Sequence, residues 1–328
     1  MSRRGSNLTL LALSGGLVAS GLLAWTLPEL TATPLYWLHR VLGIALVLWL
    51  VWKYGVARGS LRRRLPRGLS LAVVASILAS VALAATLALG LAWTFGLVSF
   101  AVPWTYSALN LHVLIGSGLF ALVLIHAALR WERRPPFSRK GRRDLLRLAT
   151  LGSIAVVGTT LLERFADERR VTGSKHAGSF NGNAFPLTIW NFDRVPAIDE
   201  AAWRLTVDGA VAAPGTLGYA DVLALPAREV VALIDCTGGW WSEQRWRGPR
   251  VGDVLARHGP LAHSTNATVI SVTGHRWTFL VTELEDAILA THVGGEPLSA
   301  GHGFPVRLVL GERRGFQWIK WVDRIELS

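Results

Sequence analysis

The chain has 328 residues, of which 51% are hydrophobic and only 17% are charged. Ordinary soluble proteins carry roughly 25% charged residues, so this composition excludes a chain that is soluble throughout. The net charge of +12 raises the question of nucleic-acid binding, but many of the Lys and Arg lie beside apolar runs, at residues 3–4, 53–67 and 130–143. Membrane topology explains this pattern better, and we do not expect nucleic acid as a partner.

Five apolar segments precede residue 165, and each is about long enough to span a bilayer as a helix, which takes roughly 20 residues. They lie at residues 8–27, 35–56, 69–95, 106–129 and 145–162. The connectors after the second and fourth, RGSLRRRLPRG and RWERRPPFSRKGRR, are densely basic, whereas PELTATP and GLVSFAVPW contain neither Lys nor Arg. Because basic loops stay in the cytoplasm, the sequence predicts an all-α bundle of five transmembrane helices in a bacterial cytoplasmic membrane. Everything after about Glu163 is then extracytoplasmic.

Three histidines lie in this membrane half: His39 in the second segment, and His112 and His126 in the fourth. An ionisable group inside a membrane helix is a functional hypothesis by default, with isolated, hydrogen-bonded histidines as the alternative. His39 and His112 are predicted at similar depth, and two opposed imidazoles are the axial ligands of b-type haem. His126 follows His112 by fourteen residues, as in the two-haem helices of quinol-oxidising cytochromes b, but Lys53 occupies the matching position after His39. We expect one haem b held by His39 and His112, with His126 as a weaker candidate.

The fifth apolar segment begins differently from the others. GRRDLLRLATLGSIAVVG places Arg142 and Arg143 before a polar residue and a moderately apolar run, which resembles a twin-arginine export signal. The alternative is that these two arginines only set the orientation of the helix. A twin-arginine signal would imply that the following domain crosses the membrane already folded around a cofactor.

The C-terminal part alternates short β-rich runs with turns, which predicts an α+β domain dominated by sheet. Helical pattern is limited to residues 219–225, 251–258 and 284–291. The predicted organisation has three parts: a haem b membrane domain of four helices at 1–143, a fifth helix with the export-like signal and a linker at 144–176, and a catalytic domain at 177–328.

Cys236 is the single cysteine of the chain, which excludes an intramolecular disulfide and any Cys-rich zinc or iron–sulfur site. It follows a buried-looking strand in ALIDCTGGWW, and the two glycines after it allow a ligand to approach the backbone closely. A lone cysteine is often an inert small hydrophobe. The residues by themselves leave both interpretations open.

Three separated stretches agree in order and spacing with one known family. They are SFNGNAFPLTIWNFDRVPAIDEAAWRLTVDGAV, DCTGGWWSEQRWRGPRVGDVLARHG, and TGHRWTFLVTELEDAILATHVGGEPLSAGHGFPVRLVLGERRGFQWIKWVDRIEL. Together they cover nearly all of residues 180–327 and resemble the sulfite-oxidase-type molybdopterin oxidoreductases. The resemblance implies a molybdopterin-binding catalytic domain.

The resemblance also implies roles for particular residues. Cys236 would be the only protein ligand to molybdenum, and thiolate is a soft ligand suited to it. The stretch HGFPVR and the later KW map the contacts to the pterin and its phosphate onto His302, Arg307 and Lys320, with Trp318 contributing backbone. Cations and N–H donors are what a phosphate needs. Without the family, Arg307 and Lys320 would be interpreted as solvated strand residues.

Other positions bear on the cofactor and the substrate. In the family that the chain resembles, an entry loop reaches the cofactor from its other side, and the resemblance places Asn181 and Asn183 in that loop. Where sulfite oxidases place an arginine-bearing stretch after the cysteine, this chain has GGWW at residues 238–241, which predicts an apolar pocket. Where the family has an active-site Gly-Tyr, the chain has Gly274 and His275. An imidazole there can donate a proton near neutral pH, or His275 is simply a half-buried histidine at a turn.

The sequence as a whole predicts a membrane-bound molybdenum oxidoreductase. Its extracytoplasmic domain would carry out two-electron oxygen-atom transfer, and the membrane haem would exchange electrons with it and with the quinone or quinol pool. The substrate would be a small oxyanion, sulfoxide or N-oxide. The alternatives are a repair enzyme resembling methionine sulfoxide reductases and a non-catalytic domain on a membrane anchor.

Overall fold

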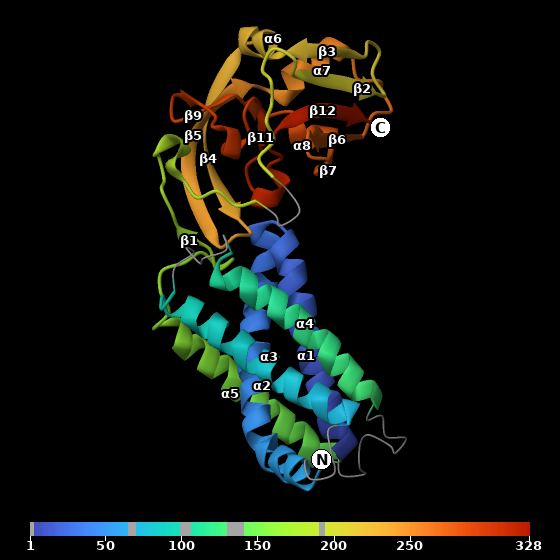
Figure 1. The fold of residues 1–328 in the computed structure, drawn as a ribbon, viewed down its shortest axis with the longest axis vertical. Coiled ribbons are helices and arrows are strands. Elements are labelled where there is room, and N and C mark those ends of the chain that lie inside the picture. The colour runs from blue at the N-terminus through green and yellow to red at the C-terminus, as the bar shows by residue number, and fades with distance from the viewer. Residues whose placement is uncertain (1–2, 65–69, 99–105, 130–140, 190–193) are drawn as a thin grey trace. The chain divides into compact units, whose positions relative to one another are not determined.

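The protein forms two compact units, which divide between Gly173 and Ser174. The structure, a computed structural model, describes residues 3–64, 70–98, 106–129, 141–189 and 194–328 (Figure 1). The predicted start of the catalytic domain at residue 177 lies close to the division. The predicted boundary after residue 143 falls inside the fifth helix, which belongs to the same unit as the first four.

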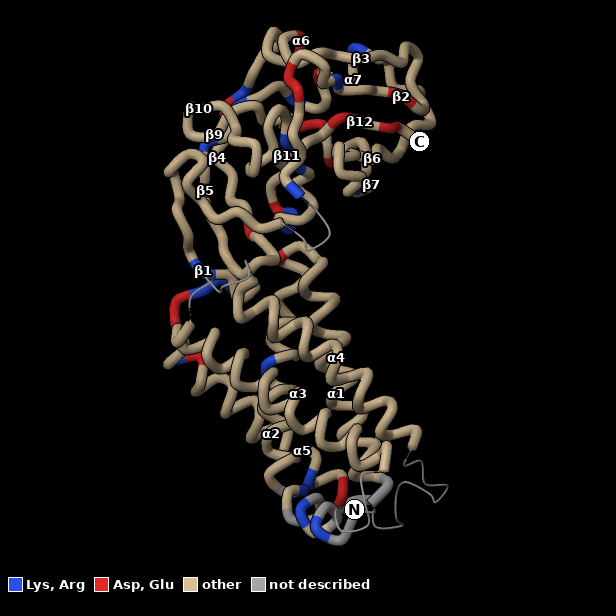
Figure 2. Tube along the Cα trace, viewed as in Figure 1, with Lys and Arg blue, Asp and Glu red and all other residues tan. Residues whose placement is uncertain are grey.

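Unit 1 consists of five long helices, and each contains a stretch long and apolar enough to cross a membrane. They are α1 (Arg3–Thr26), α2 (Glu29–Arg64), α3 (Leu71–Thr94), α4 (Ala108–Leu129) and α5 (Gly141–Glu163). Helix α1 packs against α2 and α4, α3 packs against α4, and α5 packs against α2. Residues 71–129 contain no charged residue, and Figure 2 shows Lys and Arg gathered near the C-terminal turns of α2. The five predicted apolar helices are therefore confirmed.

Helix α2 is longer at both ends than its apolar segment predicts. It begins at Glu29, so most of the predicted connector PELTATP is helical and Pro34 lies inside the helix. Pro34 is near the N-terminus, where a missing N–H removes a single hydrogen bond. At the other end the helix continues to Arg64 because Leu and Arg are good helix formers. The rest of that basic connector, residues 65–68, and most of the other basic connector lie outside the described residues.

Unit 2 is built from two five-stranded sheets, a strand pair and short helices, and is rich in strands as predicted (Figure 1). The first sheet contains β1 (Lys175–His176), β4 (Ala227–Cys236), β5 (Trp240–Pro249), β9 (His292–Val293) and β10 (Glu296–Pro297). The second has the order β3 (Gly215–Gly218), β2 (Arg204–Gly209), β12 (Val322–Leu327), β6 (Asn266–Ser271) and β7 (Arg276–Leu280). Strands β8 (Ile288–Ala290) and β11 (Arg307–Val309) pair separately. The helices are α6 (Tyr219–Ala224), α7 (Val251–His258) and α8 (Val281–Leu284), with 3₁₀ turns η2 (Gly182–Ala184), η3 (Ala300–His302) and η4 (Gly315–Gln317).

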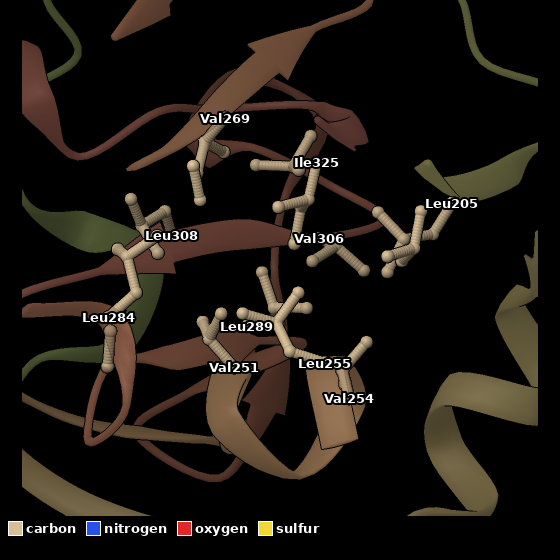
Figure 3. Close-up of a cluster of buried hydrophobic side chains, with 14 of the residues drawn as sticks. Leu205, Val251, Val254, Leu255, Val269, Leu284, Leu289, Val306, Leu308 and Ile325 are labelled. Atoms are coloured by element: carbon tan, nitrogen blue, oxygen red, sulfur yellow. The ribbon is translucent and has the colours of Figure 1, made fainter. Parts of the chain in front are cut away.

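The hydrophobic core of unit 2 lies between the second sheet, α7 and the β8–β11 pair (Figure 3). Strand β6 buries every second residue, as expected for a strand with one face on the core. Helix α7 buries Val251, Val254 and Leu255 on one face, the spacing of an amphipathic helix. Val306 and Leu308 belong to this core, which therefore fixes the start of β11. The first residue of β11 is Arg307, one of the predicted site residues.

The helix predicted at residues 284–291 is wrong. Helix α8 ends at Leu284, and residues 288–290 form β8, which pairs antiparallel with β11. All three residues of β8 are buried. A short apolar run fits a buried strand and a buried helix equally well by pattern, and here the long-range pairing with β11 decides the structure.

Candidate functional site

Cys236 is the last residue of β4, at the turn of the long hairpin that β4 forms with β5. It pairs with Trp240 across the hairpin. Gly239 has a φ of 91°, a left-handed conformation that favours glycine, and its N–H donates to the Cys236 carbonyl at 3.0 Å. The N–H of Gly238 donates to Cys236 Sγ at 3.3 Å. The GG pair after the cysteine therefore forms a tight turn that directs a backbone donor at the sulfur.

The Cys236 thiol is buried, with 8% of its surface exposed. Burial raises the pKa of the thiol, and this effect is opposed by the Gly238 hydrogen bond, the Thr188 hydroxyl and the charges of Arg314 and Lys320. The deprotonated form of this thiol would therefore have donors and cations around it. Metal binding releases the proton from such a group.

Cys236 opens into a cavity to which six of the predicted residues contribute. Those six are Cys236, His275, His302, Arg307, Trp318 and Lys320. Much of the remaining lining is apolar: Phe185, Pro186, Leu187, Ile189, Ile234, Trp240, Phe316 and Trp321. The structure thus gathers residues that are far apart in the chain around one cavity with a thiol, two cations and an apolar wall.

Arg307 is the more deeply buried of the two cations, with 4% of its surface exposed. Its guanidinium lies 5.4 Å from the ring centre of Trp246 and 6.0 Å from that of Trp318. Within the described residues its Nε atom is buried without a hydrogen-bond partner. Burial lowers the pKa of Arg307 to about 10, so the group is still charged at neutral pH. A buried cation with unused donor capacity fits an anionic group.

Lys320 is the second cation of the cavity. Its Nζ donates to the Gly301 carbonyl at 3.1 Å and to the Thr188 carbonyl at 3.3 Å, and lies 4.5 Å from the ring centre of Trp321. These contacts hold the ammonium between the η3 turn and the 185–189 segment. Lys320 is therefore not the solvated strand residue that its sequence position would suggest on its own.

His302 lines the cavity, but both of its ring nitrogens bond to protein. Its Nδ1 lies 2.7 Å from Ser299 Oγ and its Nε2 lies 3.0 Å from the Phe185 carbonyl. Burial and the nearby charge of Arg307 lower the pKa of His302 to about 4. A neutral ring that donates from Nε2 and accepts at Nδ1 satisfies both partners. His302 therefore joins the η3 turn to Phe185 and presents its ring to the cavity.

The lowered pKa of His302 makes the stability of unit 2 depend on pH. Because the unfolded state binds its proton near pH 6.5 and the folded state only near pH 4, the stabilisation is complete above pH 6.5 and is lost as the pH falls to 4. The loss amounts to at most about 3 kcal/mol. We expect His302→Gln, which keeps a donor and an acceptor but does not titrate, to lose less stability between pH 7 and pH 5.

The measurement is denaturant unfolding of the full chain in detergent at both pH values, followed by tryptophan fluorescence. His263→Gln, which changes an exposed histidine, is the matched control and should keep the parent's pH dependence. An equal loss of stability on acidification in His302→Gln and the parent would contradict this prediction.

His275 lies at the cavity beside the η4 turn. Its Nε2 is 2.8 Å from the Phe316 carbonyl, so Nε2 is the protonated nitrogen and Nδ1 is the basic one. Ser271 and Thr273 line the cavity next to it. His275 thus lies at the cavity, and its role in proton donation stays a prediction.

Asn181 and Asn183 do not line the cavity. Asn181 Oδ1 accepts a hydrogen bond from Gln244 at 3.1 Å. Asn183 donates to the Pro297 carbonyl at 2.9 Å and accepts from the Ser299 N–H at 2.8 Å. Asn183 therefore supports the loop that carries Ser299 and His302, and direct contact of either asparagine with a cofactor stays a prediction.

Trp241, in the predicted apolar stretch GGWW, also lies away from the cavity and packs against His176, with ring centres 4.7 Å apart. Only Trp240 of that pair lines the cavity. Its Nε1 donates to Thr188 Oγ1 at 2.8 Å. The 185–189 segment and Phe316 lie within the motif stretches, but the sequence assigned them no role at the site, because only the fold brings them to Cys236.

In unit 1, His39 of α2 and His112 of α4 face one another. Their ring centres are 6.1 Å apart and their planes differ by 74°. Two imidazoles on opposite sides of one metal ion, with metal–nitrogen bonds of about 2.0 Å, have ring centres about 6 Å apart. His39 and His112 would therefore be the residues of unit 1 that could hold one haem iron between them.

The hydrogen bonds of the two rings fit the same role. His39 Nδ1 lies 2.9 Å from the Leu17 carbonyl and His112 Nδ1 lies 2.8 Å from the Thr86 carbonyl. A carbonyl can only accept, so each Nδ1 carries the proton and each Nε2 has a lone pair. A backbone carbonyl on the far nitrogen is how metal-bound histidines are oriented.

Glycines on the neighbouring helices make room for these rings. A Cβ on Gly21 of α1 would lie 3.1 Å from the His39 ring, and a Cβ on Gly90 of α3 would lie 2.9 Å from His112 Nδ1. His126 instead lies near the other end of α4, with Nδ1 3.0 Å from Ser76 Oγ. Among the described residues no cluster of three or more His, Cys, Asp or Glu is arranged for a metal ion.

Comparison with known proteins relates unit 2 to one family. Residues 192–328 match the oxidoreductase molybdopterin binding domain. Over 178 residues, 43% of this chain, it is 30% identical to an NADH nitrate reductase of Hordeum vulgare and covers 19% of that protein. Over 169 residues, 41% of this chain, it is 29% identical to the mitochondrial sulfite oxidase of Rattus norvegicus and covers 30% of it. The chain thus spans less than a third of either relative.

Among solved structures, the sulfane dehydrogenase SoxCD of Paracoccus pantotrophus matches 41% of this chain and 40% of its own, with 22% identity and a TM-score of 0.40. The family match and the sequence relatives agree with the resemblance in the three motif stretches. The C-terminal part of the chain is therefore similar to the molybdopterin-binding domains of oxidoreductases such as sulfite oxidase and nitrate reductase.

Proposed function

We propose that this protein is a membrane-bound molybdenum oxidoreductase whose C-terminal unit carries out two-electron oxygen-atom transfer outside the cytoplasm. The observation that carries the proposal is the cavity that joins the buried Cys236 thiol to two cations, the buried Arg307 and the half-buried Lys320. The thiol suits a soft metal ligand, and the two cations suit the phosphate of a molybdopterin. The family match of residues 192–328 supports the same cofactor.

Within this proposal each cavity residue has a definite task. Cys236 would supply the protein ligand to molybdenum, whose chemistry is the transfer of an oxygen atom coupled to two electrons. Arg307 and Lys320 would bind the anionic end of the pterin cofactor. His302 would hold the η3 turn in place through Ser299 Oγ and the Phe185 carbonyl.

The substrate would meet the apolar part of the cavity and His275. Trp240, Leu187 and Phe316 line this part, and both cations are committed to the cofactor in the proposal. Such a pocket favours a neutral sulfoxide or N-oxide over sulfite itself. The His275 imidazole, oriented by the Phe316 carbonyl, would supply or accept the proton of the reaction.

Unit 1 would supply the electron connection through one haem b. The 6.1 Å separation of the His39 and His112 ring centres, with both Nδ1 atoms bonded to carbonyls, supports this assignment. A membrane haem changes oxidation state by single electrons, and the quinone or quinol pool is the partner available in the bilayer. The basic end of α2 supports a topology with that end in the cytoplasm.

Metal and cofactor analysis tests the proposal directly. Full-length protein from a host that makes molybdopterin should contain about one molybdenum and about one haem b per chain, measured by elemental analysis and by the pyridine haemochrome assay. Absence of molybdenum and pterin from such protein would overturn the enzymatic proposal and favour a non-catalytic domain on an anchor.

The export of unit 2 gives a further prediction, because Arg142 and Arg143 lie in the first turn of α5. Their side chains lie outside the described part of the structure. Changing both to Lys preserves the charge that orients the helix but removes the guanidinium pair, whose planar donor fork lysine does not replace. We expect exported C-terminal domain to fall by about tenfold or more, while the first four helices still insert.

Protease added to the outside of spheroplasts measures this export. The matched control is Arg62→Lys, a change elsewhere in the basic segments that should leave export unchanged. If the double Lys variant exposes its C-terminal domain to protease as fully as the parent, the arginine pair only orients α5.

A further inference from the structure

A buried ion pair lies directly behind Cys236. Arg314 Nη1 is 2.7 Å from Asp235 Oδ2, and the two side chains are only 2% and 7% exposed. Ser174 Oγ donates to the other carboxylate oxygen, Asp235 Oδ1. Asp235 immediately precedes Cys236 in β4. The buried ion pair is therefore formed by the residue next to the proposed metal ligand.

The ion pair joins two adjacent segments that both line the cavity, one ending at Cys236 and the other forming the η4 turn. Asp235 and Arg314 also form a parallel β-bridge through their backbones. Arg314 precedes the η4 turn, and a Cβ on Gly315 would lie 3.0 Å from the Cys236 Cα. The backbone of the η4 turn therefore touches the cysteine itself, and the next residue, Phe316, orients His275. Movement of Arg314 would therefore shift both Cys236 and His275.

Stability alone explains this pair poorly. Removing two charges from water costs about as much as their attraction returns, so hydrophobic replacements of buried pairs are often neutral or stabilising. Within the described residues, Nε of Arg314 is buried without a hydrogen-bond partner, so charge holds the guanidinium more than hydrogen bonding does. A costly charged contact of this kind, placed at the proposed metal ligand, points to a role in the site.

We infer that Asp235 and Arg314 are positioning residues, which fix the Cys236 turn against the η4 turn and set the electrostatic potential at the metal with two opposed charges. This inference rests on the proposed role of Cys236 as the molybdenum ligand. It predicts effects of opposite sign when either charge is removed, because charges in a buried site act on the metal with little screening.

The test uses the full-length holoenzyme and measures molybdenum content, the Mo(V) paramagnetic spectrum and the midpoint potential of the metal. Arg314→Met leaves the carboxylate unopposed and should lower the potential. Asp235→Asn leaves the guanidinium unopposed and should raise it. Arg314→Lys keeps the charge and should stay closest to the parent in potential.

The double variant Asp235→Asn with Arg314→Met leaves no unpaired buried charge and keeps the test decisive if a single variant does not fold. Its potential should return toward that of the parent, while its Mo(V) spectrum stays altered because the Cys236 turn has lost its attachment. Asp208→Asn, which breaks an ion pair with Arg324 in the second sheet, is the control and should leave both readouts unchanged.

Two results would count against the inference in different ways. Parent-like potential and spectrum in molybdenum-loaded Asp235 and Arg314 variants, or shifts of the same sign in both single variants, would overturn the positioning role alone. A parent protein that contains no molybdenum would overturn the proposed function and this inference with it.

Discussion

Replacing Cys236 with Ser should abolish turnover, to below about 1% of the parent, and should eliminate or reshape the Mo(V) signal while leaving the haem spectrum intact. The physical reason is the loss of the only thiolate in the chain, since an alcohol is a poor ligand for a soft site. The serine hydroxyl can still accept the Gly238 N–H, so the hairpin turn should keep its structure.

Activity assays with a sulfoxide, an N-oxide and sulfite, together with paramagnetic resonance, measure this effect. Thr237→Ser is the matched control, because it changes the next residue of the cavity wall without altering the sulfur. The molybdopterin content of Cys236→Ser is informative as well, since Arg307 and Lys320 remain to bind the cofactor. Parent-level turnover in Cys236→Ser would contradict the assignment of Cys236 as the metal ligand.

The five membrane-type helices could be predicted from the sequence because their signal is local. An apolar run of bilayer length needs no partner to be visible, and residues 71–129 contain no charge to interrupt it. The ends of α2 were misjudged for a local reason as well. Pro34 resembles a helix start, whereas the structure tolerates it one turn inside the helix that begins at Glu29.

Unit 2 was less predictable because its elements depend on long-range pairing. The overall class, rich in strands, followed from short β-rich runs separated by turns, and α7 followed from the helical pattern of residues 251–258. Strand β5 has a weak signal in the sequence, because its residues include charges and glycine and it is held by pairing with β4 along its whole length. Residues 288–290 were assigned to a helix because their local pattern fits a helix as well as a strand. Only their pairing with β11 identifies them as a strand.

The predicted site residues came from motifs, and the structure brings most of them to one cavity. The residues that the motifs did not identify are those that act through contacts with residues far away in the sequence. Thr188 meets Trp240 through a side-chain hydrogen bond, and Arg314 meets Asp235 across about eighty residues of sequence. Neither spacing has a periodic signal, so only the folded chain shows that these side chains surround Cys236.

Replacing either His39 or His112 with Ala should remove nearly all of the b-type haem spectrum. Each ring would supply one of two axial bonds, and their ring centres are placed 6.1 Å apart by two different helices. His126→Ala should keep close to one haem per chain, because His126 lies fourteen residues further along α4. The pyridine haemochrome assay measures all three variants, and a value of two haems per chain in the parent would refute the single-haem assignment.

A sharper version of this prediction leaves both histidines in place. In Gly90→Ala the new Cβ would lie 2.9 Å from His112 Nδ1, so the ring must turn away from the Thr86 carbonyl that orients it. Disturbing the group that orients a metal-bound histidine typically weakens binding by about 10- to 100-fold, and haem retention should fall accordingly. Gly118→Ala on α4 meets no atom within 4 Å and should retain haem like the parent. Equal haem retention in the two variants would show that the position of the His112 ring does not matter, which is incompatible with axial ligation by that ring.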